Sequence, residues 1–213
     1  FLKVPSVSPG LFLFLLLMTI NLFDDSSWET LRPLTFTRPV ADLRVGILTI
    51  AEKWAKYLNA DFGFQTQDYL SVKYTTKKNA NLFINGSICP DQALVDTISQ
   101  LKDGEVLIKG DILIAHHNDP ADLEAVTFNK EILYTRDFVR IIYPENIFTN
   151  NPGEIRKDFE LLTKGRTSAK ISSTNQLLGN DIFFEEGAKA ECSVLNSGYG
   201  PIYVGKNAEI WEG

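Results

Sequence analysis

Residues 21–54 read NLFDDSSWETLRPLTFTRPVADLRVGILTIAEKW, and this stretch decides the fold. An apolar strand pattern at residues 20–23 ends in two adjacent carboxylates, Asp24 and Asp25. A charged loop follows, and from Ile47 to Leu58 the apolar residues recur at three- and four-residue spacing, which is typical of an amphipathic helix. The stretch therefore predicts a strand, a charged loop and a helix.

Two arginines, Arg38 and Arg44, lie in this loop. In α/β proteins the carboxyl end of a strand beside a helix N-terminus is a common place for anionic ligands. A guanidinium suits phosphate because it donates paired hydrogen bonds to phosphoryl oxygens. Alternatively, the arginines pair with Asp24, Asp25 or Asp42 in a solvated network, and the spacing leaves both interpretations open.

The composition is that of a globular protein. The chain has 213 residues, of which 44% are hydrophobic and 23% charged, enough for one sizeable domain and a smaller part. Its net charge of −6 argues against general nucleic-acid or anionic-membrane binding, which requires basic surface. An anionic substrate must then meet a local basic pocket. The two cysteines, Cys89 and Cys192, lie in apolar surroundings without metal-ligand spacing, which favours a reducing cytoplasm.

The N-terminal segment begins with Phe1 and contains an apolar run at residues 11–17. It lacks the small-residue cleavage site of a signal peptide, and it is shorter than the roughly 20 residues of a membrane span. Met18 is the only methionine. We therefore predict that residues 1–17 lie upstream of the natural start, with a genuine anchor or signal as the alternative.

Further patterns alternate between strand and helix. Strands are expected at residues 81–84, 105–109 and 112–116, the last two as a hairpin, and helices at 91–104 and 154–162. Residues 118–125 indicate a polar loop or short helix. The alternation predicts an α/β domain over residues 18–176, with a mainly parallel sheet and helices on both faces.

A second pattern begins near residue 177. The segments 184–188 and 204–208 each place a small residue four positions after an apolar one, and 190–194 is a weaker copy. This is the hexapeptide signature of a parallel β-helix, with an antiparallel meander as the alternative. Such repeats bury a core only by stacking roughly three or more units. We therefore expect residues 177–213 to be the first coils of a longer solenoid, and the chain to be a fragment.

The run DD..W..LRPLTFTRPVADLRVGILTIAEKW resembles the opening of a bacterial family of sugar nucleotidyltransferases. That family is related to the bifunctional uridylyltransferase/acetyltransferase that makes UDP-N-acetylglucosamine. The resemblance covers nearly everything from Met18 to Gly213. It implies a Rossmann-like nucleotidyltransferase domain followed by a left-handed β-helix, a homotrimer once the β-helix is complete, and acyltransferase chemistry in the continuation.

The resemblance also implies a reaction and its residues. A nucleoside triphosphate and a sugar 1-phosphate, of the N-acetylglucosamine 1-phosphate type, would react with Mg²⁺ to give a nucleotide sugar and pyrophosphate. Arg38 and Arg44 would be catalytic, and Asp25 and Asp111 would bind the metal. The predicted substrate- or nucleotide-binding residues are Asp24, Thr37, Lys53, Asn85 and Gly86.

The chain departs from the family pattern at two places. Characterised relatives carry a Gly-x-Gly-Thr-Arg loop followed by Pro-Lys, whereas this chain keeps only Thr37-Arg38-Pro39 and lacks the lysine. Their metal-binding Gly-Asp pair is matched here by Gly86-Ser87. Two alternatives follow: a catalytically degenerate sugar-nucleotide-binding or regulatory domain fused to a hexapeptide acyltransferase, and a trimerisation scaffold.

Overall fold

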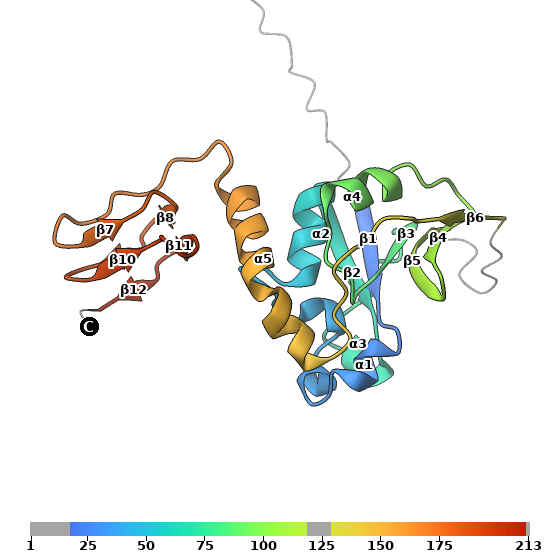
Figure 1. The fold of residues 1–213 in the computed structure, drawn as a ribbon. Helices are drawn as coiled ribbons and strands as arrows, with labels where there is room; N and C mark the ends of the chain where they lie inside the picture. The colour runs from blue at the N-terminus through green and yellow to red at the C-terminus, as the bar shows by residue number, and fades with distance from the viewer. Residues whose placement is uncertain (1–17, 119–128, 212–213) are drawn as a thin grey trace, which may run out of the picture.

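The computed structural model describes residues 18–118 and 129–211. Its first part is built on a six-stranded sheet in the order β2-β1-β3-β5-β4-β6 (Figure 1). The strands are β1 (Met18–Phe23), β2 (Ala60–Gln65), β3 (Leu82–Asn85), β4 (Glu105–Lys109), β5 (Ile112–His117) and β6 (Lys130–Leu133). Strand β1 is parallel to β2 and β3, and β4 to β6, whereas β5 is antiparallel to β3 and β4. The predicted mainly parallel sheet and the hairpin are thus confirmed.

The helices of this part are mostly short. They are α1 (Ser27–Thr30), α2 (Ile50–Leu58), α3 (Asp68–Ser71), α4 (Gln92–Ile98) and α5 (Pro144–Thr163), with 3-10 turns η1 (Leu34–Thr37) and η2 (Val40–Asp42) in the charged loop. No helix within the described ranges has the length and apolar character that crossing a bilayer requires. The predictions for residues 1–17, and for most of 118–125, lie outside the described residues.

Helix α2 begins at a capping box. The Thr49 hydroxyl oxygen accepts the Glu52 N–H at 3.2 Å, and the Glu52 carboxylate accepts the Thr49 N–H at 2.7 Å. The apolar spacing predicted a start at Ile47. The structure begins the helix later because Arg44 and Thr49 first form an antiparallel bridge that closes a tight loop.

The two faces of the sheet differ. Ile20 and Ile84 face a fully buried apolar cluster that also contains Trp54 of α2 and Leu94 of α4. The opposite face carries Asn21, Phe83 and His116, because successive strand residues point to opposite sides. There the Asn21 side chain exchanges hydrogen bonds of 2.9 Å with the backbone of Lys77, and the Phe83 and His116 rings stack with centroids 4.8 Å apart. We predicted helices on both faces of the sheet. Helices α2 and α4 cover one face.

Besides α2, which begins later than predicted, α4, which ends at Ile98 rather than near residue 104, and the unpredicted α1 and α3, two larger elements differ from the sequence prediction. Strand β2 was not predicted, because Gly63 and the polar residues around it interrupt the apolar alternation. Helix α5 was predicted only from Glu154, because the Asn-Asn-Pro-Gly run at 150–153 is typical of a loop. The helix instead continues through Pro152.

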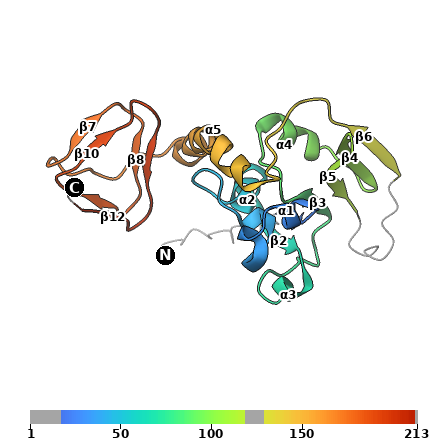
Figure 2. The same cartoon turned by 60° about the horizontal axis from the view of Figure 1, so that its bottom comes forward.

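The second part follows α5 and consists of short strands: β7 (Gln176–Leu178), β8 (Ile182–Phe184), β9 (Lys189–Ala190), β10 (Val194–Asn196), β11 (Ile202–Val204) and β12 (Glu209–Ile210). They pair in parallel as β7 with β10, β8 with β11 and β9 with β12. Figure 2 shows these pairs around a common interior. Buried within it are Phe184, Ala188, Ala190, Leu195 and Val204, which include apolar and small positions of the hexads.

Helix α5 lies between the two parts (Figure 1). Arg156 Nη2 donates to the backbone oxygen of Tyr199 at 2.9 Å. Near the end of the helix, Arg166 pairs with Glu185, with Nη2 and Oε2 at 2.5 Å. These contacts join the helix region to the strands that follow it.

Candidate functional site

The carboxyl end of β1 is a point where the chain changes direction across the sheet. From β1 the chain passes through α2 to β2 on one side and then crosses to β3 on the other. In open α/β sheets, ligands bind outside the carboxyl ends of strands at such a switch point. A cavity of about 330 Å³ lies there, lined by Phe23, Asp24, Gln65, Thr66, Gln67, Leu113 and His116.

Asp24 forms part of the wall of this cavity. Its Oδ1 accepts the Val40 N–H at 2.9 Å, and its Oδ2 accepts the Thr66 hydroxyl at 2.6 Å. Burial raises the pKa of Asp24 to about 6, although these two hydrogen bonds favour the charged form. A carboxyl group that titrates near neutral pH inside a cleft is characteristic of functional sites.

The next carboxylate, Asp25, points toward β3 instead. Its Oδ1 accepts the Ser27 N–H at 2.9 Å and the Ser27 hydroxyl at 2.5 Å. Its Oδ2 accepts from Asn85 Nδ2 at 2.8 Å and from Arg140 Nη2 at 2.6 Å. Burial opposes the charge, but these donors together lower the pKa of Asp25. Asp25 is therefore an ionised and fully engaged carboxylate.

Arg140 joins the ends of β1 and β3. Besides Asp25, its Nε donates to Ser87 Oγ at 3.2 Å, and the Ser87 hydroxyl donates to Asn85 Oδ1 at 2.7 Å. A backbone bridge between Arg140 and Ile88 holds the segment in place. Sequence reasoning missed Arg140, which lies 115 positions from Asp25 and outside any recognisable motif. Thr66 was missed as well, because β2 itself was not predicted.

Gly86 allows β1 and β3 to end close together. Its N–H donates to the Phe23 carbonyl at 2.8 Å, and a Cβ at this position would lie 3.1 Å from both that oxygen and Ala41 Cβ. A side chain here would push the strand ends apart. Gly86 thereby brings Asn85 and Ser87 within reach of Asp25 and Arg140. The prediction that Asn85 and Gly86 contact substrate stays a prediction.

Thr37 and Arg38 lie in the loop before Val40, whose N–H donates a hydrogen bond to Asp24. Thr37 ends η1, and Arg38 follows in extended conformation. The Arg38 guanidinium is half exposed, and its Nη1 lies 4.0 Å from Asp42 Oδ2. Arg38 is thus on the loop that reaches the cavity, where it forms a long ion pair at the surface.

Arg44 belongs to a different contact. Its Nη1 donates to the Ile47 carbonyl, and its Nη2 lies 3.8 Å from the Glu52 carboxylate. The following Gly46 has a φ of +91°, and a Cβ there would lie 2.5 Å from Asp158 Oδ2, so this position requires glycine. The loop therefore docks on α5, which does not support a contact between Arg44 and a ligand at Asp24.

Lys53 is placed by the structure in the interior. Its side chain is 1% exposed, and its Nζ lies 2.5 Å from Asp158 Oδ1 and 2.9 Å from Glu154 Oε2. We predicted that Lys53 binds the substrate or the nucleotide. The structure speaks against this, because a buried ammonium paired with two carboxylates is not available to a ligand. The helical pattern of α2 could not reveal these partners, since both lie on α5.

The predicted metal ligands are not brought together as a cluster. Asp111 is exposed in the turn between β4 and β5, and Asp25 already accepts hydrogen bonds that include one from a guanidinium. Within residues 18–118 and 129–211 no group of three His, Cys, Asp or Glu side chains could hold a metal ion. These residues fit Mg²⁺ in one arrangement: Asp24 would supply a single carboxylate ligand, and substrate phosphates and water would supply the others.

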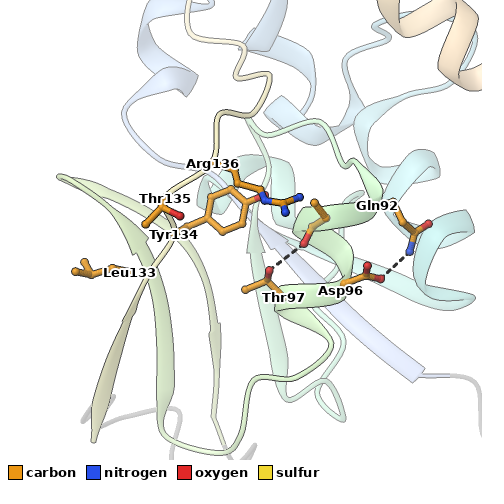
Figure 3. A pocket seen from close by; sticks show the side chains of 8 residues that line it. Gln92, Asp96, Thr97, Leu133, Tyr134, Thr135 and Arg136 are labelled. Atoms are coloured by element: carbon orange, nitrogen blue, oxygen red, sulfur yellow. Dashed lines mark hydrogen bonds between the residues drawn. The ribbon is translucent and has the colours of Figure 1, made fainter.

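A larger cavity, of about 560 Å³, lies between α4 and residues 133–136 (Figure 3). In its wall Gln92 Nε2 donates to Asp96 Oδ1 at 2.7 Å, and the buried Tyr134 hydroxyl has no hydrogen-bond partner among the described residues. None of the predicted site residues lines this cavity. We therefore place the candidate site at the end of β1.

Comparison with known proteins identifies the family. Residues 20–167 match the model of one protein family, described as sugar nucleotidyl transferase, and this range contains every site residue named above. A search of curated proteins found no match. The family match covers more than half of the chain, including all six strands from β1 to β6 apart from the first residues of β1. The chain belongs to the sugar nucleotidyl transferase family.

Proposed function

We propose that this protein transfers a nucleotidyl group from a nucleoside triphosphate to a sugar 1-phosphate and releases pyrophosphate. A phosphate oxygen of the sugar 1-phosphate attacks the α-phosphorus in line, and the bond to the β-phosphate breaks. The observation that carries the proposal is the position of Asp24, in a cavity at the switch point of the sheet and inside the family match.

The residues around this cavity have separate proposed roles. Asp24 holds one coordination position for Mg²⁺, which when bound supplies positive charge to the triphosphate. Thr66 and Val40 fix the orientation of the Asp24 carboxylate by donating to its two oxygens. Arg38 lies on the loop that is hydrogen-bonded to Asp24, and its positive charge binds the other phosphate-bearing substrate, the sugar 1-phosphate. Thr37 positions that loop.

The resemblance to the UDP-N-acetylglucosamine-forming enzyme supports N-acetylglucosamine 1-phosphate as the sugar substrate, in a cytoplasmic setting. The parallel pairs β7–β10, β8–β11 and β9–β12 support a left-handed β-helix from residue 177 onward. By the same resemblance, a complete β-helix would assemble a homotrimer and would carry acyltransferase chemistry in its later coils.

Pyrophosphate release tests the function directly. The protein is assayed with each common nucleoside triphosphate and with the 1-phosphates of glucosamine, N-acetylglucosamine, glucose and mannose, with and without Mg²⁺. We expect release that requires one sugar phosphate and Mg²⁺, and a loss of at least a hundredfold in Asp24→Ala. Absence of release from protein shown by calorimetry to be folded would contradict the proposal.

Two observations favour a second candidate, a sugar-nucleotide-binding domain without turnover. Asp25 is neutralised by Arg140, and serine occupies position 87 where the resembling enzymes have their metal-binding aspartate. Binding of a nucleotide sugar, measured by calorimetry, without pyrophosphate release would support this second function. Release at a normal enzymatic rate would exclude it.

A further inference from the structure

We propose that Arg140, held between the ends of β1 and β3, binds a phosphate of the substrate, and that Asp25 and Ser87 position its guanidinium. The inference rests on the proposed function, because it takes a phosphate-bearing substrate as the ligand. The structural observation behind it differs from the one behind the proposed function: two side-chain acceptors hold the Arg140 guanidinium between the ends of β1 and β3.

The contacts of Arg140 fix its orientation without using all its donors. Nε donates to Ser87 Oγ at 3.2 Å and Nη2 donates to Asp25 Oδ2 at 2.6 Å. Nη1 makes no hydrogen bond to any residue that the structure describes. The side chain is 18% exposed, so one edge of the planar group is anchored and part of it remains accessible. An anchored guanidinium with free N–H donors matches the paired oxygens of a phosphate.

Asp25 accepts hydrogen bonds from three donors besides Arg140. They are the Ser27 N–H, the Ser27 hydroxyl and Asn85 Nδ2. Asn85 is itself fixed by a second hydrogen bond, 2.9 Å long, to the Leu113 carbonyl. The network therefore fixes the position of the Asp25 carboxylate, and the carboxylate in turn orients the guanidinium of Arg140.

The other candidate cations are placed less favourably for this role. Lys53 is buried against α5, and Arg44 closes the loop before α2. Arg38 is on the right loop but is half exposed, and a 4.0 Å ion pair orients it only weakly. A protein with a net charge of −6 needs at least one well-oriented cation to bind a polyanion. Arg140 meets that requirement by geometry.

The competing explanation is that Arg140 only ties the strand ends together. Removing it alone would leave Asp25 with one donor fewer and lower stability, which would obscure a binding effect. We therefore choose two variants: Arg140→Lys, which keeps the charge, and the double variant Asp25→Asn/Arg140→Met, which removes both charges. Arg136→Met is the matched control, since Arg136 is an exposed arginine on the same segment and lines the other cavity.

Binding of inorganic pyrophosphate, and of a nucleoside triphosphate with Mg²⁺, is measured by calorimetry at two salt concentrations, with the unfolding midpoint recorded for each variant. We expect the double variant to bind pyrophosphate at least tenfold more weakly with a smaller salt dependence, Arg140→Lys at least threefold more weakly, and Arg136→Met within twofold of wild type. A folded double variant with wild-type affinity and salt dependence would overturn the inference, as would the absence of pyrophosphate binding by the wild type.

These outcomes are distinct from those that decide the proposed function. If wild type binds pyrophosphate through Arg140 but never turns over, the role of Arg140 stands and the transferase proposal fails. If both variants keep a wild-type KM for the triphosphate in an active enzyme, the transferase proposal stands and the role of Arg140 fails.

Discussion

Lys53 Nζ lies 2.5 Å from Asp158 Oδ1 inside the contact between α2 and α5, and both side chains are almost completely buried. Glu154 Oε2 completes the cluster at 2.9 Å. Removing one partner of a buried ion pair leaves an uncompensated charge, which is far more costly than loss of the attraction alone.

Lys53→Met should therefore lower the free energy of unfolding by about 3–5 kcal/mol, because two buried carboxylates lose their shared cation. Urea denaturation measures the change. Lys56→Met, at an exposed position of the same helix, is the control and should stay within about 0.5 kcal/mol of wild type. A loss in Lys53→Met no larger than in the control would show that the pair does not hold α5 to α2.

Asp24 makes stability depend on pH. Its pKa rises from 3.8 in the unfolded chain to about 6 in the folded protein, so the folded state binds the proton more tightly. The stability contributed by Asp24 is fully present below about pH 4 and is lost as the pH rises through about 6. Asp24→Asn removes this titration. Relative to wild type, the variant should therefore gain about 2–3 kcal/mol between pH 4 and pH 7.

Unfolding free energies of wild type and Asp24→Asn, compared at pH 4, 5, 6 and 7, check this prediction. Other groups titrate in both proteins and cancel in the difference. A difference that stays constant over this range would mean that the folded protein does not raise the pKa of Asp24.

Gly46→Ala should destabilise the protein by about 1–3 kcal/mol, because φ is +91° and the added Cβ would meet Asp158 Oδ2 at 2.5 Å. Gly153→Ala is the contrasting control: a Cβ there meets no atom within 4 Å, and the position lies inside α5. Alanine should stabilise that helix by about 0.5–1 kcal/mol. Thermal unfolding measures both, and equal shifts would argue against the close approach of the 46–48 loop to α5.

Mg²⁺ by itself should leave the unfolding midpoint unchanged, because the described residues contain no cluster able to hold a metal ion. Together with a nucleoside triphosphate it should raise the midpoint, since ligands that bind the native state stabilise it. A scan with Mg²⁺, triphosphate, both and neither separates the cases. An increase with Mg²⁺ alone would reveal a preformed metal site.

Local patterns in the sequence were enough to predict three of the elements around Asp24. The change of period after Gly46 predicted α2, and the apolar run ending in two carboxylates predicted β1. The apolar run NLFI predicted β3 to within one residue at each end. The sequence also points to the carboxyl edge of β1 as the candidate site, because strand ends and helix starts are local features; this site stays a prediction.

The partners of these residues could not be predicted in the same way. Asp25 meets Arg140, and Lys53 meets Asp158, only after distant segments pack together. Hydrophobic periodicity in a single sequence reports local structure and does not show which distant residues come into contact. The same limit explains α5, whose first half is helical against the local signal of Pro152 and Gly153, in a helix whose later turns carry the buried contacts with Lys53.

Helix α5 also has a consequence for how the two parts are connected. Its 20 residues span about 30 Å at the usual rise per residue. On one side Asp158 accepts the N–H groups of Ile47 and Leu48, and on the other Arg166 holds Glu185 among the C-terminal strands. Helix α5 and the residues that follow it therefore connect the C-terminal strands to the loop before α2 through contacts that do not involve the sheet.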